Sequence, residues 1–448
     1  MNSKDLNVRQ QRQISFLIVA VGFIFVHQYL NVREFHWDAK EYWKLGSLEA
    51  LLDQKNIRGY FYPLLLAPMK LISELMGDRW FYAYRLGTSV VYAFVLACVI
   101  PDLFVGIFGG KLSVMRRIFV PTLIALLYPG LLVYPLSDLP AFLLLFCGLA
   151  VAVSRHKIPE LILAGTLVGA AYNVRTIYLF PLIIVAICVP LVILRGREWK
   201  CRCLGGTAYL MGVALIFIPQ AIINKHVQNV ASPFVMAKAA GRSLIAAQLQ
   251  WGITMQRYET SIDARVPAPQ QVYLDKAGEE IFAAERIQSP MTVRSYLSLV
   301  LSRPLDFLGI YGRHLVNGID LRDGKVYITS PTYNKNYLSI TSFTLIWIGL
   351  FVLVRMRHSK NAWFALAVLV LPVAVILPGA IETRFFLPLH FLAWSTVAFC
   401  VRPDEINCRP SRHGVTLFAL YLVVLSMFMG ISLSTMASLN YQFPEKYI

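Results

Sequence analysis

The stretch that decides the fold is residues 80–108, WFYAYRLGTSVVYAFVLACVIPDLFVGIF, in which only Arg85 and Asp102 are charged. A helix of about 20 apolar residues crosses the hydrocarbon core of a bilayer. Similar runs recur along the chain, so that 57% of its 448 residues are hydrophobic and 15% are charged, with a mean hydropathy of +0.58. Soluble domains carry about a quarter charged residues. We therefore expect an all-α polytopic membrane protein.

The apolar runs predict about eleven transmembrane helices. They fall at residues 14–30, 80–108, 118–136, 137–153, 158–174, 176–194, 204–224, 337–354, 361–379, 384–401 and 414–435. The chain then divides into an N-terminal membrane module (1–224), an outer soluble segment (225–336) and a C-terminal group of transmembrane helices (337–448). No small-residue cleavage site follows the first run, so it is not read as a signal peptide.

Charge distribution sets the expected orientation. The net charge is +17, and the basic residues cluster between spans: Lys111, Arg116 and Arg117; Arg155 and Lys157; Arg195, Arg197, Lys200 and Arg202; Arg355, Arg357 and Lys360; Arg402, Arg409 and Arg412. This spacing is typical of cytoplasmic loops under the positive-inside rule and disfavours nucleic-acid binding. We expect a cytoplasmic N-terminus in a bacterial inner membrane; a eukaryotic reticulum membrane would present the same topology.

Two long segments are then expected on the outer face, at residues 31–79 and 225–336. The first holds an amphipathic helix around Tyr42 and a short apolar piece at 62–75 that suits the membrane interface. The second predicts helices at 275–287 and 291–317, the latter starting at Ser289-Pro290. No cysteine lies in either segment, so no disulfide framework is implied.

The pair Trp37-Asp38 directly follows the first span and is the leading catalytic candidate. A carboxylate shielded by lipid and aromatic rings can hold a pKa suited to accepting a proton. Glu41 and Tyr42 lie one helical turn later and share its face. The alternative is an interfacial belt of aromatic residues with scattered charges.

Asp138 opens a predicted span and faces the same side, although an acid also suits a helix start electrostatically. Arginines on this side are less expected than on the cytoplasmic one. An anionic ligand explains them, because a guanidinium pairs with phosphate in a bidentate fashion. Each could instead reach lipid headgroups. The candidates for binding phosphate are Arg58, Arg85, Arg175 and Arg384.

Further candidates lie later in the chain. Glu382 can pair with Arg384 or with another outer arginine. His314 follows Arg313 in the outer segment and is expected as a surface histidine, with a catalytic role as the alternative. There is no P-loop, dinucleotide-binding fingerprint, metal-binding histidine pair or serine-nucleophile elbow in the sequence.

Taken together, the motifs resemble GT-C membrane glycosyltransferases, in the branch of the protein O-mannosyltransferases and aminoarabinose transferases. Four sequence stretches carry the resemblance, in order: Asp38-x-x-x-Tyr42 with Arg58-Gly59-Tyr60-Phe61-Tyr62-Pro63; Ser137-Asp138-x-Pro140; Val174-Arg175; and Glu382-Thr383-Arg384-Phe385. The resemblance covers most of the membrane part, and the 225–336 segment matches nothing in the family. It implies a fold with juxtamembrane helices in the first outer loop.

The resemblance also implies an activity: transfer of a sugar from a polyprenyl-phosphate carrier to an acceptor, with inversion. Asp38 would be the general base, and Asp138 would orient the acceptor or help to bind a divalent cation, the one cofactor implied. Arg58, Arg175 and Arg384 would hold the donor phosphate, and Arg85 is a further candidate from its position alone. Tyr42, Tyr62, Glu382 and His314 are candidates for acceptor contacts. Ala39 stands where some members have a second acid, and Glu41 could compensate.

Two other functions stay open at this point. A transporter or flippase of lipid-linked sugars would use the same arginines, but it would be expected to show symmetric halves with broken helices. A ligase that joins glycan chains is kept open by Arg313-His314. The sequence does not specify the sugar, and the acceptor could be a lipid, a glycan or a protein hydroxyl.

Overall fold

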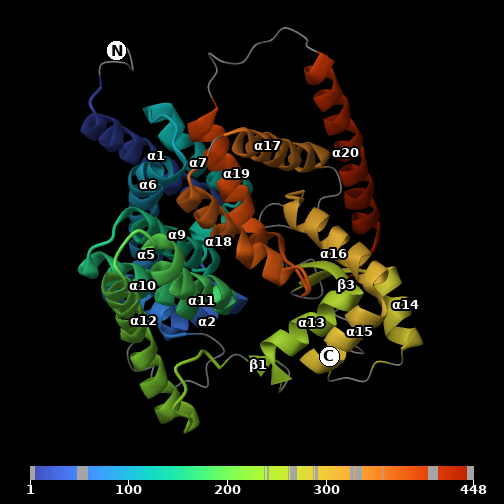
Figure 1. The fold of residues 1–448 in the computed structure, drawn as a ribbon, viewed down its shortest axis with the longest axis horizontal. Helices are drawn as coiled ribbons and strands as arrows, with labels where there is room; N and C mark the ends of the chain where they lie inside the picture. Colours follow the sequence, from blue (N-terminus) through green and yellow to red (C-terminus); the bar gives the residue numbers. More distant parts are fainter. Residues whose placement is uncertain are drawn as a thin grey trace. The chain divides into compact units, whose positions relative to one another are not determined.

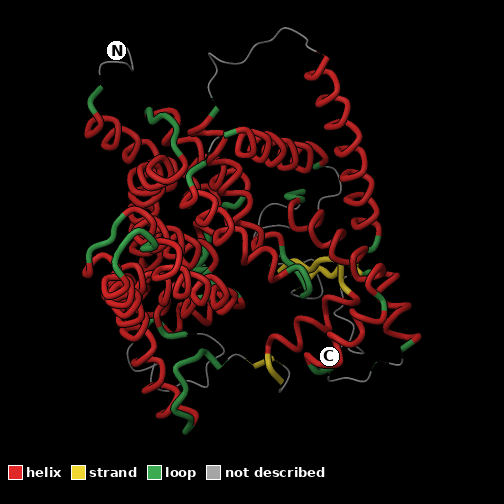
Figure 2. Tube along the Cα trace, viewed as in Figure 1, coloured by secondary structure: helices red, strands yellow, loops and turns green. Residues whose placement is uncertain are grey.

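The computed structural model describes residues 6–47, 59–236, 238–239, 242–260, 262, 270–285, 287, 291–322, 327, 335–356, 358–401 and 412–440. Helices dominate these residues, as the red segments of Figure 2 show. The chain forms two compact units. Unit 1 is Met1–Ala237 with Met356–Pro372, and unit 2 is Lys238–Arg355 with Val373–Ile448.

Six helical segments of the described chain are long and apolar enough to cross a membrane. They are Val8–Leu30 (α1), Trp80–Phe108, Thr176–Ile193, Trp199–Gln228 (α12), Asn336–Arg355 (α17) and Gly414–Ala437, within α20 (Arg412–Ala437). The second consists of α5 (Trp80–Phe94), η2 (Val95–Val99) and α6 (Ile100–Phe108), and the third of η3 (Thr176–Tyr178), α11 (Leu179–Cys188) and η4 (Val189–Ile193). The helical, membrane-embedded character expected from the sequence is therefore confirmed. The number of eleven spans stays a prediction.

The other expected spans are shorter helices. They are α7 (Val114–Leu127) with α8 (Gly130–Val133), α9 (Asp138–Ser154), α10 (Ile158–Val174), α18 (Lys360–Ile376), and η5 (Thr383–Phe386) with α19 (Leu387–Cys400). α20 shows the lipid-facing pattern most clearly. Its apolar side chains Phe418, Val423 and Met427 are 61%, 58% and 64% exposed. A helix that is apolar on its exposed faces is stable in lipid and costly in water.

In unit 1, α9, α10, α11 and α12 lie side by side (Figure 1). Small residues bring α10 and α12 together, because a side-chain carbon at Gly165 would overlap the backbone of Tyr209, and one at Gly212 would overlap that of Ile162. Close backbone approach at small residues is how helices associate without a hydrophobic driving force. The short helices α2 (Trp37–Leu45) and α4 (Phe61–Leu75) contact each other, and α4 also contacts α5 and α10.

All the described strands belong to unit 2. β1 (Lys238–Ala239) pairs with β2 (Arg242–Ser243), and β3 (Met255–Thr260), β4 (Gln270–Leu274) and β5 (Leu439–Asn440) form an antiparallel sheet. The yellow segments of Figure 2 mark them. β5 directly follows the membrane helix α20, so the end of that helix is tied to the outer segment.

The helices of the outer segment differ in part from expectation. α13 (Leu244–Thr254) precedes β3, and α14 (Lys276–Ala284) occupies the helix expected at 275–287. The single helix expected at 291–317 is wrong: the chain forms α15 (Val293–Ser302) and α16 (Pro304–Ile319). Pro304 explains the break, because proline lacks the N–H group that a continuous helix would need there and suits a first turn.

Candidate functional site

In unit 1 the candidate site begins at α2. Trp37 has φ +48°, a left-handed conformation that is costly for a bulky residue and concentrates at functional sites. Asp38 follows in the first turn of α2 and is half-buried. One turn later Tyr42 is buried, and its hydroxyl donates a hydrogen bond to Ser137 Oγ (2.9 Å). This bond fastens the first outer loop to the start of α9.

The residue after Ser137 forms the central ion pair of the site. Asp138, in the first turn of α9, accepts a hydrogen bond from Arg175 Nη1 at the end of α10. The two side chains are only 3% and 15% exposed. A buried carboxylate is stable only with such a partner. Two motifs that lie apart in the sequence therefore meet in one buried pair.

Tyr62 completes the cluster from α4. Its ring lies 4.9 Å from the ring of Tyr42 in an edge-to-face arrangement. Burial raises the pKa of Tyr62 well above its usual value, and the nearby tyrosines and Asp138 raise it further. The phenol therefore stays protonated and acts as a neutral hydrogen-bonding group. Four candidates from the sequence, Tyr42, Tyr62, Asp138 and Arg175, are thus brought together.

The start of α4 is held by residues that sequence reasoning missed. Asn173 Oδ1 accepts a hydrogen bond from the Phe61 amide (2.8 Å), and Asn173 Nδ2 donates to Gln220 Oε1 (2.8 Å). Gly59 lies so close to Asn173 that any side chain there would overlap it. Asn173 was visible as a polar residue beside Arg175, in Tyr172-Asn173-Val174-Arg175. Its partner Gln220 sits in an apolar run and gave no such signal.

The other unit 1 candidates have different surroundings. Arg58 lies outside the described residues. Glu41 is exposed on α2. Arg85 is buried and donates to Gln28 Oε1 (2.9 Å), Asn31 Oδ1 (3.1 Å) and the Val32 carbonyl (2.8 Å). These bonds fasten α5 to the end of α1, so we assign Arg85 a structural role and omit it from the proposed phosphate site.

Glu382 and Arg384 belong to unit 2, where they form a buried ion pair. Thr260 Oγ1 also donates to Glu382 Oε1 (2.8 Å). Burial raises the pKa of Glu382 to about 7; Arg384 opposes this rise, and Glu259 adds to it. The pairing of Glu382 with Arg384 that the sequence suggested is therefore present.

A second acid–arginine pair adjoins it and was not anticipated. Arg257 Nε donates to Glu259 Oε1 (2.9 Å), and Thr383 donates to the same oxygen from its amide (3.0 Å) and its hydroxyl (2.7 Å). β3 and η5 are thus joined by hydrogen bonds from Thr383 to Glu259 and from Thr260 to Glu382. Glu259 lies 124 positions before Thr383 in the sequence. Nothing in the local sequence of either residue predicts their contact.

His314 corrects an expectation. It is fully buried rather than on the surface, with Nδ1 at 2.6 Å from the Leu377 carbonyl and Nε2 at 3.0 Å from the Met255 carbonyl. Burial lowers its pKa, against the effect of the two carbonyls. His314 lies on the side of α16 that faces β3. A single histidine in a polar segment gives no sign of this burial, which is why the sequence predicts a surface position. The ring lies between the backbones of α16, β3 and Leu377.

Among the residues that the structure describes, no group of three or more His, Cys, Asp or Glu side chains could hold a metal ion. A divalent cation beside Asp138 stays a prediction from the resemblance. No protein-family model, no curated protein and no solved structure matches this chain. Fold and site define a class: a helical membrane protein with a buried acid–arginine pair beside the short helices α2 and α4.

Proposed function

We propose that the protein is an integral membrane glycosyltransferase that moves a sugar from a polyprenyl-phosphate donor to a lipid, glycan or protein acceptor. The observation that supports this most is the junction of three motifs in unit 1. The Tyr42–Ser137 hydrogen bond adjoins the Asp138–Arg175 pair, so the loop that carries Asp38 is anchored at that pair. A strained residue directly precedes Asp38.

The proposed chemistry assigns a role to each group. Asp38 accepts the proton of the acceptor hydroxyl as its oxygen attacks the anomeric carbon. The bond from that carbon to the phosphate oxygen breaks, and its electron pair leaves with the lipid phosphate. Arg175 stabilises the phosphate charge, and Asp138 orients the guanidinium. A positioned base contributes about 10²–10⁴-fold to the rate, and fixed charges at the leaving group contribute several kcal/mol.

The test is a binding and turnover comparison in nanodiscs. Undecaprenyl phosphate is titrated against the wild type, Asp38→Ala and Arg175→Ala, and sugar release is followed with a panel of undecaprenyl-phosphate sugars. We expect Asp38→Ala to bind the lipid like the wild type but to lose about 10²–10⁴-fold in turnover. Arg175→Ala is expected to bind the lipid more weakly, because it removes a bidentate phosphate partner.

Arg155→Ala is the matched control, since it removes one positive charge at a side chain that is 68% exposed and outside the cluster. Its binding and turnover should equal those of the wild type. Normal turnover by Asp38→Ala would remove the proposed base. Proton-coupled movement of the lipid-linked sugar without its hydrolysis or transfer would favour the transporter alternative instead.

A further inference from the structure

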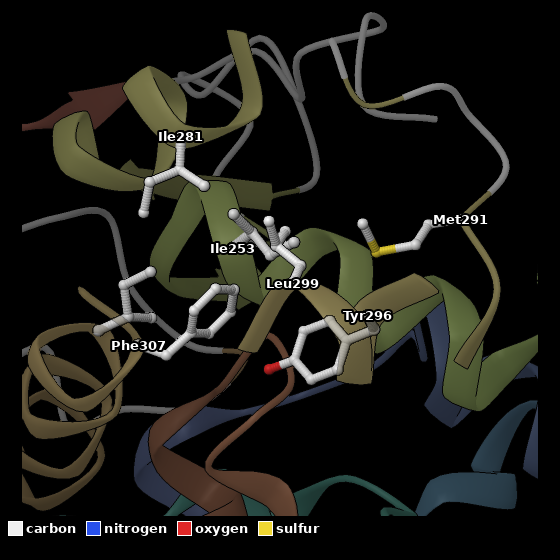
Figure 3. Close-up of a cluster of buried hydrophobic side chains, with 7 residues drawn as sticks. Ile253, Ile281, Met291, Tyr296, Leu299 and Phe307 are labelled. Atoms are coloured by element: carbon white, nitrogen blue, oxygen red, sulfur yellow. The ribbon is translucent and has the colours of Figure 1, made fainter. Parts of the chain in front are cut away.

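The outer segment of unit 2 carries an apolar surface that its own core does not use. The inner sides of α15 and α16 are already filled. Figure 3 shows Tyr296, Leu299 and Phe307 directed toward Ile253 and Ile281, and these side chains are buried. A water-facing pair of helices would place polar residues on the opposite side.

Here the opposite side carries large apolar side chains among exposed polar residues such as Ser298 and Ser302. Its exposed apolar members form what we call the outer ridge: Val293, Leu297, Leu301, Leu305 and Leu308. The α15 members recur every four residues and so share one helix face. Leu301 and Leu305, on either side of the break between the helices, are 81% and 80% exposed. Contiguous exposed apolar patches mark membrane or protein contacts.

Three charged side chains of these two helices, Arg303, Asp306 and Arg313, are paired within unit 2. Arg303 pairs with Glu285 (2.7 Å) and Asp306 (3.7 Å), and Arg313 pairs with Asp275 through two hydrogen bonds (2.7 and 2.9 Å). Asp306, which is 51% exposed, directly follows Leu305, so a charged pair borders the apolar ridge. Arg294, exposed at the start of α15, is placed to meet anionic groups at its edge.

The neighbour of α16 indicates what covers the ridge. α16 packs against α20, one of the helices that can cross a membrane. Beyond α16, Arg322 donates to Ser432 Oγ of α20 (2.8 Å), and Ser432 in turn donates to Asp320 (2.5 Å). These bonds fix the C-terminal end of α16 near the end of α20. Leu305 and Leu308 of the ridge therefore belong to a helix that contacts α20, and α15, which carries the other ridge residues, contacts α16 in turn.

We propose that α15 and α16 lie in the outer leaflet, with the outer ridge immersed in lipid at the headgroup–acyl boundary. Helices that are apolar on the exposed side and charged elsewhere bind such interfaces. The 225–336 segment is then a membrane-associated layer rather than a domain surrounded by water. This inference concerns the bilayer contact and does not depend on the proposed reaction.

The test uses nitroxide labels in nanodiscs that hold one copy of the chain. In a variant whose seven native cysteines are replaced, single cysteines are introduced by Leu301→Cys and Leu305→Cys. Collision rates are measured with oxygen, which concentrates in lipid, and with a water-soluble nickel chelate. Leu433→Cys on α20 is the lipid-facing reference, and Glu280→Cys on the exposed side of α14 is the water-facing control.

We expect the labels at 301 and 305 to resemble the label at 433, with several-fold more oxygen than nickel collisions, and the label at 280 to show the reverse. Ridge labels that resemble the label at 280 would overturn the proposal. Spin–spin broadening at 301 in proteoliposomes that vanishes on dilution with unlabelled chain, together with nickel access in single-copy nanodiscs, would assign the ridge to a second copy instead.

Discussion

At the scale of single residues, the Asp138–Arg175 pair is expected to contribute most to stability, because both charged side chains are buried away from water. Removing one partner of a buried pair leaves an uncompensated charge and costs about 3–5 kcal/mol. We therefore expect Arg175→Ala to be destabilised by that amount. Arg155→Ala, at an exposed pair with Glu160, should lose about 1 kcal/mol or less. Reversible denaturation in detergent measures both.

A double variant separates stability from ligand binding. Asp138→Asn combined with Arg175→Gln removes both charges and keeps a polar side chain at each position, so it should recover much of the lost stability. It should still bind undecaprenyl phosphate weakly, because the guanidinium is gone. Equal stability of Arg175→Ala and the wild type would contradict the burial of this pair.

Glu382 predicts a pH dependence of stability. Burial raises its pKa to about 7 in the folded protein, whereas an unfolded glutamate titrates near pH 4.3. Between these values the folded state holds a proton that the unfolded state releases. The free energy of unfolding therefore falls as pH rises from about 4.5 to 7 and levels off above the folded-state pKa.

Melting temperatures across pH 4–8 provide the measurement. Glu382→Gln keeps the size of the side chain and removes its titration, so its melting temperature should vary less with pH than that of the wild type. Glu285→Gln, at a side chain that is 41% exposed, should follow the wild-type curve. A Glu382→Gln curve that matches the wild type would assign the pH dependence to other groups.

At the element scale, the start of α4 depends on one glycine. A side chain at Gly59 would overlap Asn173, whose side-chain oxygen Oδ1 also accepts the hydrogen bond from the Phe61 backbone amide. Gly59→Ala should therefore displace the first turn of α4 and cost about 1–3 kcal/mol, as overpacking does. The proposed site should suffer too, because Tyr62 lies in that turn. Thermal unfolding and undecaprenyl phosphate binding report the two effects.

Gly106→Ala is the matched control. This glycine lies in α6, and an added carbon there would meet nothing within 4 Å. Alanine forms helices better than glycine by about 1 kcal/mol, so the control should be unchanged or slightly more stable. Equal behaviour of the two variants would mean that Gly59 has more space than the structure gives it.

For the whole molecule, the sheet of unit 2 constrains membrane topology. β5 pairs with β4, so the end of α20 lies on the same side of the membrane as the outer segment. A cysteine introduced by Asn440→Cys should therefore react with an impermeant maleimide from outside the cell. One introduced by Lys360→Cys, in a basic loop, should react only after the membrane is opened.

The labelling is done in the variant without native cysteines, with an introduced cysteine at Glu280 as the external standard. If position 440 were labelled only from the cytoplasmic side while position 280 is labelled from outside, β5 and β4 would lie on opposite sides of the membrane and could not pair. Labelling of position 360 from outside would overturn the charge-based orientation. Both results would leave the contacts within unit 1 unaffected.

The sequence by itself determined the elements of this protein. Apolar length and charge spacing placed α9, α10 and α17 within one residue of their observed bounds, since a helix in lipid must satisfy its own backbone and exclude charges. Breaks inside polar segments were harder, as the division at Pro304 shows. Trp37-Asp38, Asp138 and Arg175 were also recognisable, because charges beside apolar runs are costly unless they have a purpose.

Only the tertiary structure decided which of these residues meet. Arg175 pairs with Asp138, and Tyr42 bonds to Ser137, while Asn173 and Gln220 hold the start of α4. These partners depend on how the helices pack and not on the local sequence pattern, because buried polar groups pair with whatever packing brings near them. The same reason explains His314, whose burial between α16 and β3 no neighbouring residue announced. Sequence pattern records whether a position faces lipid or water, while the partner of a buried charge is fixed only when distant helices come together.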